Sequence, residues 1–310
     1  MARSPAAGPV RALRPRLAPD VTAEEAFVAV FAASLSHVAR NAPGAARGGD
    51  PEYLHQLRVG LRRLRASLRA FRPLVSRACA EKIVAPLRPL APALGEARDW
   101  DVFYPRLVEM ARAAGGANGA REALLRNAVA RRRAAQQRLR RAIGGKRFAL
   151  WLQSAWRWLA QAPWRKQRTV PAAARNRRLA THAKAVLKRM RRKLWRNGAR
   201  LDWNDAPARH AFRIRLKRFR YACELFRAAF EDRVAARFIK RLKRLQDVLG
   251  DLNDNAVAQR LLAELCAAPP RERRSALPAR VRERLALEAA LLQQELAPAW
   301  REVRKAPRFW

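Results

Sequence analysis

Hydrophobic positions in this chain recur at helical spacing from about residue 22 onward, because apolar residues return every three or four positions. Short segments rich in proline and glycine interrupt the pattern, and no segment alternates apolar and polar residues as a strand would. The pattern therefore predicts an all-α protein with eight to ten helices. The basic, proline-broken residues 1–20 are expected to form a disordered tail.

The second half of the chain repeats the first half at a fixed offset. His210 follows His55 by 155 residues, and Leu249 follows Leu94 by the same number, without a gap between them. The offset is half the chain length, which indicates an internal duplication. We therefore expect one domain over residues 22–310, made of two repeats at about 22–165 and about 176–310.

The repeated segment predicts a helix that carries two stripes. Asp50 and Pro51 form an N-cap and a first-turn proline, and Asp205 falls in register with Asp50. The apolar stripes contain Leu54, Leu57, Leu61, Leu64, Leu68 and Phe71 in the first copy, and Phe212, Leu216, Phe219, Cys223 and Phe226 in the second. The basic stripes contain His55, Arg58, Arg62, Arg65, Arg69 and Arg72 in the first copy, and His210, Arg213, Lys217 and Arg220 in the second. Arg63 and Arg218 are further basic candidates.

The position of the basic stripe favours a binding role over a merely solvated surface. A solvated face normally lies opposite the core and mixes charges of both signs. Here the basic stripe lies one residue, or roughly 100°, beside the apolar stripe, and its first copy contains no acid. Like charges at this spacing repel each other unless a ligand supplies the opposite charge. Arginine donates paired hydrogen bonds to phosphate oxygens, so phosphate is the ligand that these stripes suit.

Composition strengthens this interpretation without identifying the ligand. The chain has 310 residues with 67 Lys and Arg against 25 Asp and Glu, a formal net charge of +42. Such a charge implies a polyanionic partner, and nucleic acid, an acidic membrane surface and phosphate polymers all remain open. Three widely spaced cysteines exclude a disulfide framework and a cysteine zinc site. We expect no signal peptide, no membrane span and a cytoplasmic location.

The two repeated motifs resemble the CHAD family, the conserved histidine α-helical domain. "LHQLRVGLRRLRASL" and "RHAFRIRLKRFRYACELF" are each followed by an LG-acid motif, "LGEARD" and "LGDLND". The resemblance implies two pseudo-symmetric helical bundles around a basic cavity or channel, and non-enzymatic binding of inorganic polyphosphate, with an association with polyphosphate granules. It also adds two basic positions ahead of the second motif, Arg88 and Lys243. No cofactor and no metal are implied.

Acidic residues of the second motif require a separate interpretation. Glu96 and Asp99 in the first copy match Asp251 and Asp254 in the second. They could ligate metal or act as acid and base, but we favour a supporting role in which they pair with the arginines and cap the following helix. On that reading, removal of an acid would loosen phosphate binding.

Two other functions remain as alternatives. A basic helical protein with this charge would bind RNA or DNA nonspecifically at low salt, although the tryptophans of "WLQSAWRW" and "PW" lie away from the basic stripes. A polyphosphate or triphosphate hydrolase would have to act through Glu96 and Asp99 or Asp251 and Asp254, because no P-loop is present. Oligomeric state, chain-length preference and protein partners do not follow from the sequence.

Overall fold

The computed structural model describes residues 8–13, 15–18, 20–115, 118–167, 170–267 and 276–310. These residues form eleven α-helices and three short 3₁₀ helices, with no β-strand among them. The all-α prediction is confirmed. The predicted count of eight to ten helices is too low, because two short helices, α3 (Arg77–Val84) and α7 (Ala172–Arg175), form between segments that the sequence marks as breaks.

The remaining elements follow in two similar series. The first contains α1 (Ala23–Arg47), α2 (Pro51–Ala70), η1 (Ala85–Leu87), α4 (Ala91–Ala113), α5 (Asn118–Gly144), α6 (Lys146–Gln161) and η2 (Pro163–Lys166). The second contains α8 (Leu179–Ala199), α9 (Ala206–Phe226), η3 (Arg227–Ala229), α10 (Asp232–Cys266) and α11 (Leu277–Lys305). Helix α9 begins 155 residues after α2, as the proposed duplication predicts, and the duplication itself stays a prediction.

Prolines explain the main difference between the two series. Helix α10 is continuous, whereas the corresponding part of the first series is divided into α3, η1 and α4. Pro86 and Pro89 lie at this break, and the positions 155 residues later hold Arg241 and Arg244. Proline lacks an amide donor and clashes with the preceding turn, so two prolines three residues apart favour a break here, although α1, α4 and α11 each accommodate a single interior proline.

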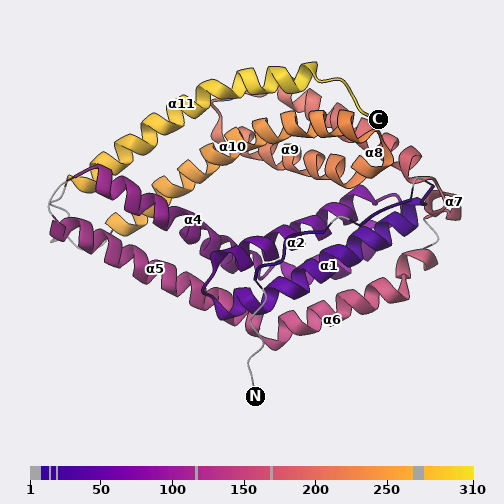
Figure 1. The fold of residues 1–310 in the computed structure, drawn as a ribbon, viewed down its shortest axis with the longest axis horizontal. Coiled ribbons are helices and arrows are strands. Elements are labelled where there is room, and N and C mark those ends of the chain that lie inside the picture. Colours follow the sequence, from indigo (N-terminus) through magenta and orange to yellow (C-terminus); the bar gives the residue numbers. More distant parts are fainter. Residues whose placement is uncertain (1–7, 14, 19, 116–117, 168–169, 268–275) are drawn as a thin grey trace.

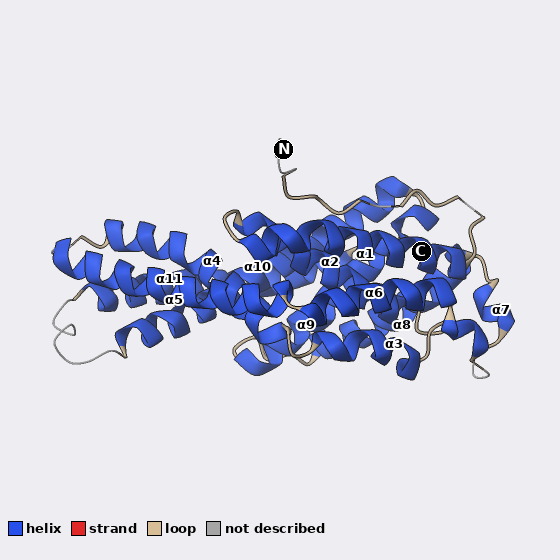
Figure 2. Ribbon diagram, turned by 90° about the horizontal axis from the view of Figure 1, so that it is seen from below, coloured by secondary structure: helices blue, strands red, loops and turns tan. Residues whose placement is uncertain are grey.

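The helices form two packed regions that share α4 and α10. Helices α4, α5, α10 and α11 extend together to one end of the molecule (Figure 1). Helices α1, α2, α6, α8 and α9 pack at the other end, which is the thicker part in the view from below (Figure 2). Between these regions α2 contacts α9, and α4 contacts both α2 and α10. Four helices from both halves of the chain therefore meet at one place.

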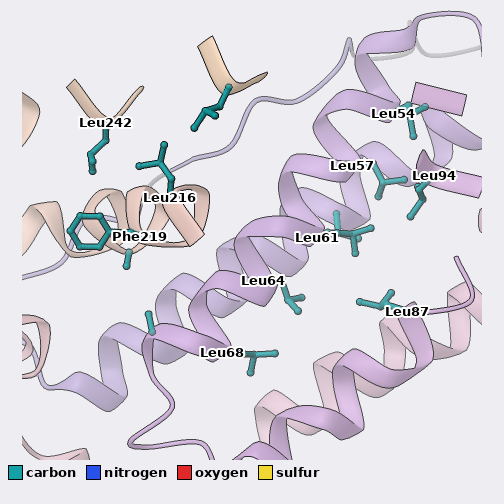
Figure 3. Packing of buried hydrophobic residues seen from close by; sticks show 14 of the residues in the cluster. Leu54, Leu57, Leu61, Leu64, Leu68, Leu87, Leu94, Leu216, Phe219 and Leu242 are labelled. Carbon is teal, nitrogen blue, oxygen red and sulfur yellow. The ribbon is translucent and has the colours of Figure 1, made fainter. Parts of the chain in front are cut away.

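Both predicted apolar stripes are buried. The α2 leucines are at most 4% exposed, and Leu87 and Leu94 lie alongside them (Figure 3). In α9, Phe212, Leu216 and Phe219 are at most 1% exposed, and Leu216 and Phe219 lie close to Leu242 of α10 (Figure 3). Truncation of such residues to alanine typically costs about 2–5 kcal/mol. The apolar stripes thus fix the rotation of α2 and α9, and with it the direction of the basic stripes.

N-caps set where these two helices begin. The Asp50 carboxylate accepts a hydrogen bond from the Glu52 amide at 2.8 Å, and the Asp205 carboxylate accepts one from the Ala208 amide at 3.2 Å. Each cap precedes a proline in the first turn of its helix. The predicted starts of both helices are therefore confirmed, and each basic stripe begins near a capped helix end.

Part of the N-terminal segment is bound to the helices. The Val10 amide donates to Asn41 Oδ1 at 3.0 Å, and the Val10 carbonyl oxygen accepts from Asn41 Nδ2 at 3.0 Å. His37 Nε2 lies 2.9 Å from the same carbonyl oxygen. Val10 is therefore held against α1, while the disordered tail expected over residues 1–20 stays a prediction, and residues 1–7, 14 and 19 lie outside the described residues. None of the described helices has the length and apolarity that a membrane span needs.

Candidate functional site

A cavity of about 230 Å³ lies where α2, α4, α9 and α10 meet. We call it the basic cavity. Its charged and polar lining consists of His55, Arg58, Arg62, Arg98, Asp99, Arg106, Arg213, Lys217, Asn253 and Asp254. Val102, Phe103, Val257 and Ala258 supply its apolar wall. The cavity therefore brings together residues from both basic stripes and from both copies of the acidic motif.

Positive charge dominates the basic cavity. Six arginine and lysine side chains line it, against two aspartates. Five of the predicted site residues, His55, Arg58, Arg62, Arg213 and Lys217, come from α2 and α9 and lie in this one cavity. A dense cluster of cations in a concave, partly dry site attracts a polyanion more strongly than the same charges on an open surface.

The lowered pKa of Lys217 shows how closely the positive charges of the cavity lie together. Burial, together with the positive charges of Arg213 and Arg62, lowers the pKa of Lys217 to about 7. Burial likewise lowers the pKa of Arg58 and of Arg213, although Asp99 and Asp254 respectively oppose the shift. The pKa of His55 is lowered first by burial and then by the charge of Arg98. A bound anion would raise all four of these pKa values, because it stabilises the charged forms.

Several arginines of the basic stripes carry a donor atom without a hydrogen-bond partner. The Nε atoms of Arg62, Arg65 and Arg213 are buried and make no hydrogen bond among the described residues. Arg58 is fixed through a hydrogen bond from Nη1 to the Leu94 carbonyl oxygen. Buried donors without partners are costly, and a ligand rich in acceptor oxygens would remove that cost.

Helix α9 also positions Arg62 through the ring of Tyr221. The guanidinium of Arg62 lies 5.2 Å from the centroid of the Tyr221 ring, and that of Arg220 lies 4.6 Å from the same centroid. Arg220 is held further by Gln246, whose amide oxygen accepts from Arg220 Nε at 2.7 Å, and by an ion pair with Glu224. Arg220 is thus committed to protein partners, whereas Arg62 keeps a free Nε.

Beyond the cavity the basic stripe of α2 continues along the helix. Arg65 is half-buried, and its pKa is lowered by burial and then by Arg88. Arg69 is accessible to water, yet its pKa is lowered to about 10, first because the surrounding protein removes part of its hydration and then because of the charge of Arg218. These two residues do not line the basic cavity, and they extend its positive potential along α2.

Other predicted site residues lie outside the basic cavity. Arg88 is 65% exposed and pairs with Glu81. Lys243, Arg72 and Arg218 are exposed. Arg63 lines a different cavity, beside Pro15 and Leu17 of the N-terminal segment. His210 is exposed, and its Nδ1 lies 3.2 Å from Asn253 Oδ1, so it reaches the cavity only through a lining residue.

The acidic motif differs only in part from its prediction, because Asp99 and Asp254 line the basic cavity and their charges act on Arg58 and Arg213. Glu96 accepts from Arg138 Nε at 2.9 Å, and Asp99 lies 3.7 Å from Arg260 Nη2, so within the described residues these ion pairs reach arginines outside the stripes. Asp254 accepts from Asn253 at 3.2 Å. Burial, followed by the charge of Asp254, raises the pKa of the exposed Asp251. The expected capping of a following helix is wrong, because all four acids lie inside α4 or α10.

Arg98 and Arg106 are lining residues that the stripe argument did not include. They are eight residues apart on α4, with Val102 midway between them, so all three lie on one helix face. Arg106 also pairs with Glu288 of α11. The position 155 residues after Arg106 holds Leu261, so the repeat did not mark Arg106 as a candidate site residue. Across the described residues there is no group of three or more His, Cys, Asp or Glu arranged to hold a metal ion.

Comparison with known proteins identifies the family. The family model described as "CHAD domain" matches residues 29–263, more than half of the chain. This chain belongs to the CHAD domain family. No curated protein sequence matches it.

Two solved structures resemble the CHAD fold of this chain closely. The CHAD domain from the plant Ricinus communis is 28% identical, with a TM-score of 0.78, and the match covers 98% of this chain and 99% of that one. PptA from Streptomyces chartreusis is 19% identical, with a TM-score of 0.68, and the match covers 91% of this chain and 100% of that one. At that identity the second similarity shows the fold alone.

Proposed function

We propose that this CHAD protein binds inorganic polyphosphate in the basic cavity and does not turn it over. The observation that carries the proposal is the cavity itself, where six cations from α2, α4 and α9 meet around two aspartates. Polyphosphate carries no bases and has a dense row of charge, so cations alone suffice to hold it. Membership of the family supports this choice of polyanion, since the resemblance implies polyphosphate binding.

Bound polyphosphate would supply the hydrogen-bond acceptors that the arginines of the cavity lack. Phosphate oxygens can accept from the unpaired Nε atoms of Arg62 and Arg213, and they can restore the charge of Lys217. Counterions released from the polymer would add to the affinity, which should therefore fall with salt. The two halves of the chain would contribute to one shared site, as a duplication with a common cavity predicts. A cytoplasmic location at polyphosphate granules belongs to this proposal.

A titration in the presence of RNA tests the choice of polyanion. At about 150 mM salt, where exposed charges are largely screened, polyphosphate should bind with unchanged affinity when excess RNA is present. Loss of polyphosphate binding under excess RNA would instead assign the cavity to nucleic acid. Phosphate release on incubation with Mg²⁺ or Mn²⁺ would contradict the non-enzymatic part of the proposal.

A further inference from the structure

A second basic groove lies on α8, outside the basic cavity. It has a volume of about 350 Å³, and its lining shares no residue with the basic cavity. We call it the α8 groove, and it is lined by Lys188, Arg191, Arg192, Trp195, Arg196 and Arg308. We propose that the α8 groove binds single-stranded nucleic acid, a function separate from that of the basic cavity.

The charge of the α8 groove is unbalanced. Helix α8 contains no Asp or Glu. Within the described part of the chain, none of the five cations of the groove forms an ion pair with an acid. Lys188, Arg192 and Arg196 recur every four residues, so they stand in a row with a repeat of about 6 Å. Like charges at this spacing destabilise a helix, which a row of bound phosphates would reverse.

An aromatic side chain lies within this row of cations. The Arg191 guanidinium lies 4.3 Å from the centroid of the Trp195 ring. The Trp195 ring is fixed by edge contacts with Phe219 and Trp300, at centroid distances of 6.0 Å and 5.3 Å. Gly198 permits this packing, because a Cβ there would lie 2.3 Å from the Trp300 ring. The result is a rigid flat platform beside exposed cations.

Arg191 has unused binding capacity. Its Nε atom is buried and has no hydrogen-bond partner among the described residues. Burial, followed by the charge of Arg308, lowers its pKa. A guanidinium plane that covers an aromatic ring can stack with a base while its remaining N–H groups contact phosphate.

The corresponding face of α1 already holds an extended chain. The residues that precede Arg192 and Arg196 by 155 positions are His37 and Asn41, which hydrogen-bond the main chain of Val10. Arg192 and Arg196 are exposed instead. The same helix face therefore accommodates an extended segment in the first half, and in the second half it presents cations suited to an extended polyanion.

Nucleic acid fits the α8 groove better than a phosphate chain does. A phosphate chain offers nothing to a tryptophan, whereas bases have flat faces that stack on aromatic and guanidinium planes. Consecutive phosphates of a nucleic-acid strand are also separated by a whole sugar, while those of polyphosphate share a bridging oxygen. The combination of spaced cations and a fixed aromatic platform is typical of sequence-tolerant single-strand binding.

A binding experiment with a labelled oligouridylate tests the proposal. The variant R192Q/R196Q should bind it at least about tenfold more weakly, and its slope of log affinity against log salt should fall by about 1.4. The matched control is R131Q/R141Q, which removes two exposed arginines of α5 and should keep both values near wild type. The variant R191K keeps its charge, so it should lose affinity with little change in salt slope.

Parallel titrations with polyphosphate separate this proposal from the function of the basic cavity. R192Q/R196Q should keep polyphosphate affinity, and a cavity variant such as R213Q/K217Q should keep oligouridylate affinity. The proposal is overturned if R192Q/R196Q binds oligouridylate like wild type or no worse than R131Q/R141Q does. It is also overturned if R192Q/R196Q loses polyphosphate as strongly as oligouridylate, because the groove would then accept any polyanion.

Discussion

The guanidinium of Arg62 lies 5.2 Å from the centroid of the Tyr221 ring, and this contact joins α2 to α9. Arg62 lines the cavity and Tyr221 does not. An aromatic face attracts a cation without neutralising it, so Tyr221 can orient Arg62 while leaving its charge available to a ligand.

Replacement of Tyr221 should therefore weaken polyphosphate binding indirectly. Tyr221→Leu removes the ring, and we expect a loss of about 0.5–1 kcal/mol, or roughly two- to fivefold in affinity, by calorimetry. Tyr221→Phe keeps the ring and should bind like wild type. Equal losses in both variants would show that the hydroxyl group, and not the ring, supports the site.

Lys217 should couple ligand binding to proton uptake. Its pKa is about 7 in the free protein, and a bound phosphate raises it, so binding near pH 7–8 should draw protons from solution. Affinity should fall as pH rises through this range, and calorimetry in buffers of different ionisation enthalpy measures the protons taken up. Lys217→Arg stays charged and should lose most of the pH dependence. If the Lys217→Arg variant took up as many protons as wild type, the proton uptake would belong to another group.

The stability of the free protein should respond to pH in the opposite direction. Unfolded Lys217 has a pKa near 10.4, so between pH 7 and 10 the unfolded state binds more protons than the folded state. The free energy of unfolding should therefore rise with pH, by an amount worth roughly a few degrees in Tm. Lys217→Met should remove this rise. If the Tm of wild type and the Tm of Lys217→Met both fell over this pH range, the lowered pKa of Lys217 would be contradicted.

Asp254 should limit the affinity of the basic cavity. It lines the cavity, and its one hydrogen bond within the described residues is to Asn253, so its charge acts on Arg213 without a hydrogen bond or ion pair that would hold that side chain in place. Asp254→Asn removes a repulsive charge and should strengthen polyphosphate binding by about two- to fivefold. Weaker binding in this variant would restore the supporting role that the sequence suggested. Glu96→Gln provides the control, because the Glu96 carboxylate pairs with Arg138 outside the cavity.

The anchor at Val10 should contribute to stability and not to ligand binding. Asn41 is fully buried and makes both hydrogen bonds to Val10, so Asn41→Ala should cost about 1–3 kcal/mol. Limited trypsin digestion should then cut faster after Arg11 or Arg16. Polyphosphate affinity should stay near that of wild type. A large loss of affinity would place the N-terminal segment in the binding site.

Much of this architecture could be predicted from the spacing of residues. The leucines of α2 and the phenylalanines of α9 are buried as their periodicity indicates, and Asp50 and Asp205 begin their helices as caps. Local signals of this kind depend only on neighbours within one helix. Because burial of the apolar stripe fixes the rotation of each helix, the neighbouring cations were predictable as a stripe.

The composition of the cavity was less predictable, because it depends on how helices cross. Arg88 and Lys243 occupy matching positions ahead of the second motif but are exposed, while Arg106 has no basic counterpart in the repeat and lines the cavity. The pairing of Arg191 with Trp195 was not predicted, because the repeated basic stripes of α2 and α9 do not include α8. The exposure of Arg88 and Lys243 and the position of Arg106 depend on how helices far apart in sequence cross, which periodicity does not encode, whereas Arg191 and Trp195 are one turn apart on α8 and their contact could have been read from the spacing.

Two triple variants that remove equal charge test the central claim most directly. R62Q/R213Q/K217Q changes three lining residues of the basic cavity, and R72Q/R88Q/K243Q changes three exposed cations outside it. Polyphosphate affinity is measured by calorimetry at about 150 mM salt, with melting curves to show that both variants fold. The cavity variant should bind at least about 100-fold more weakly, and the exposed variant should stay within a few fold of wild type. Equal losses in the two variants would contradict a site in the basic cavity and indicate nonspecific attraction to a chain of net charge +42.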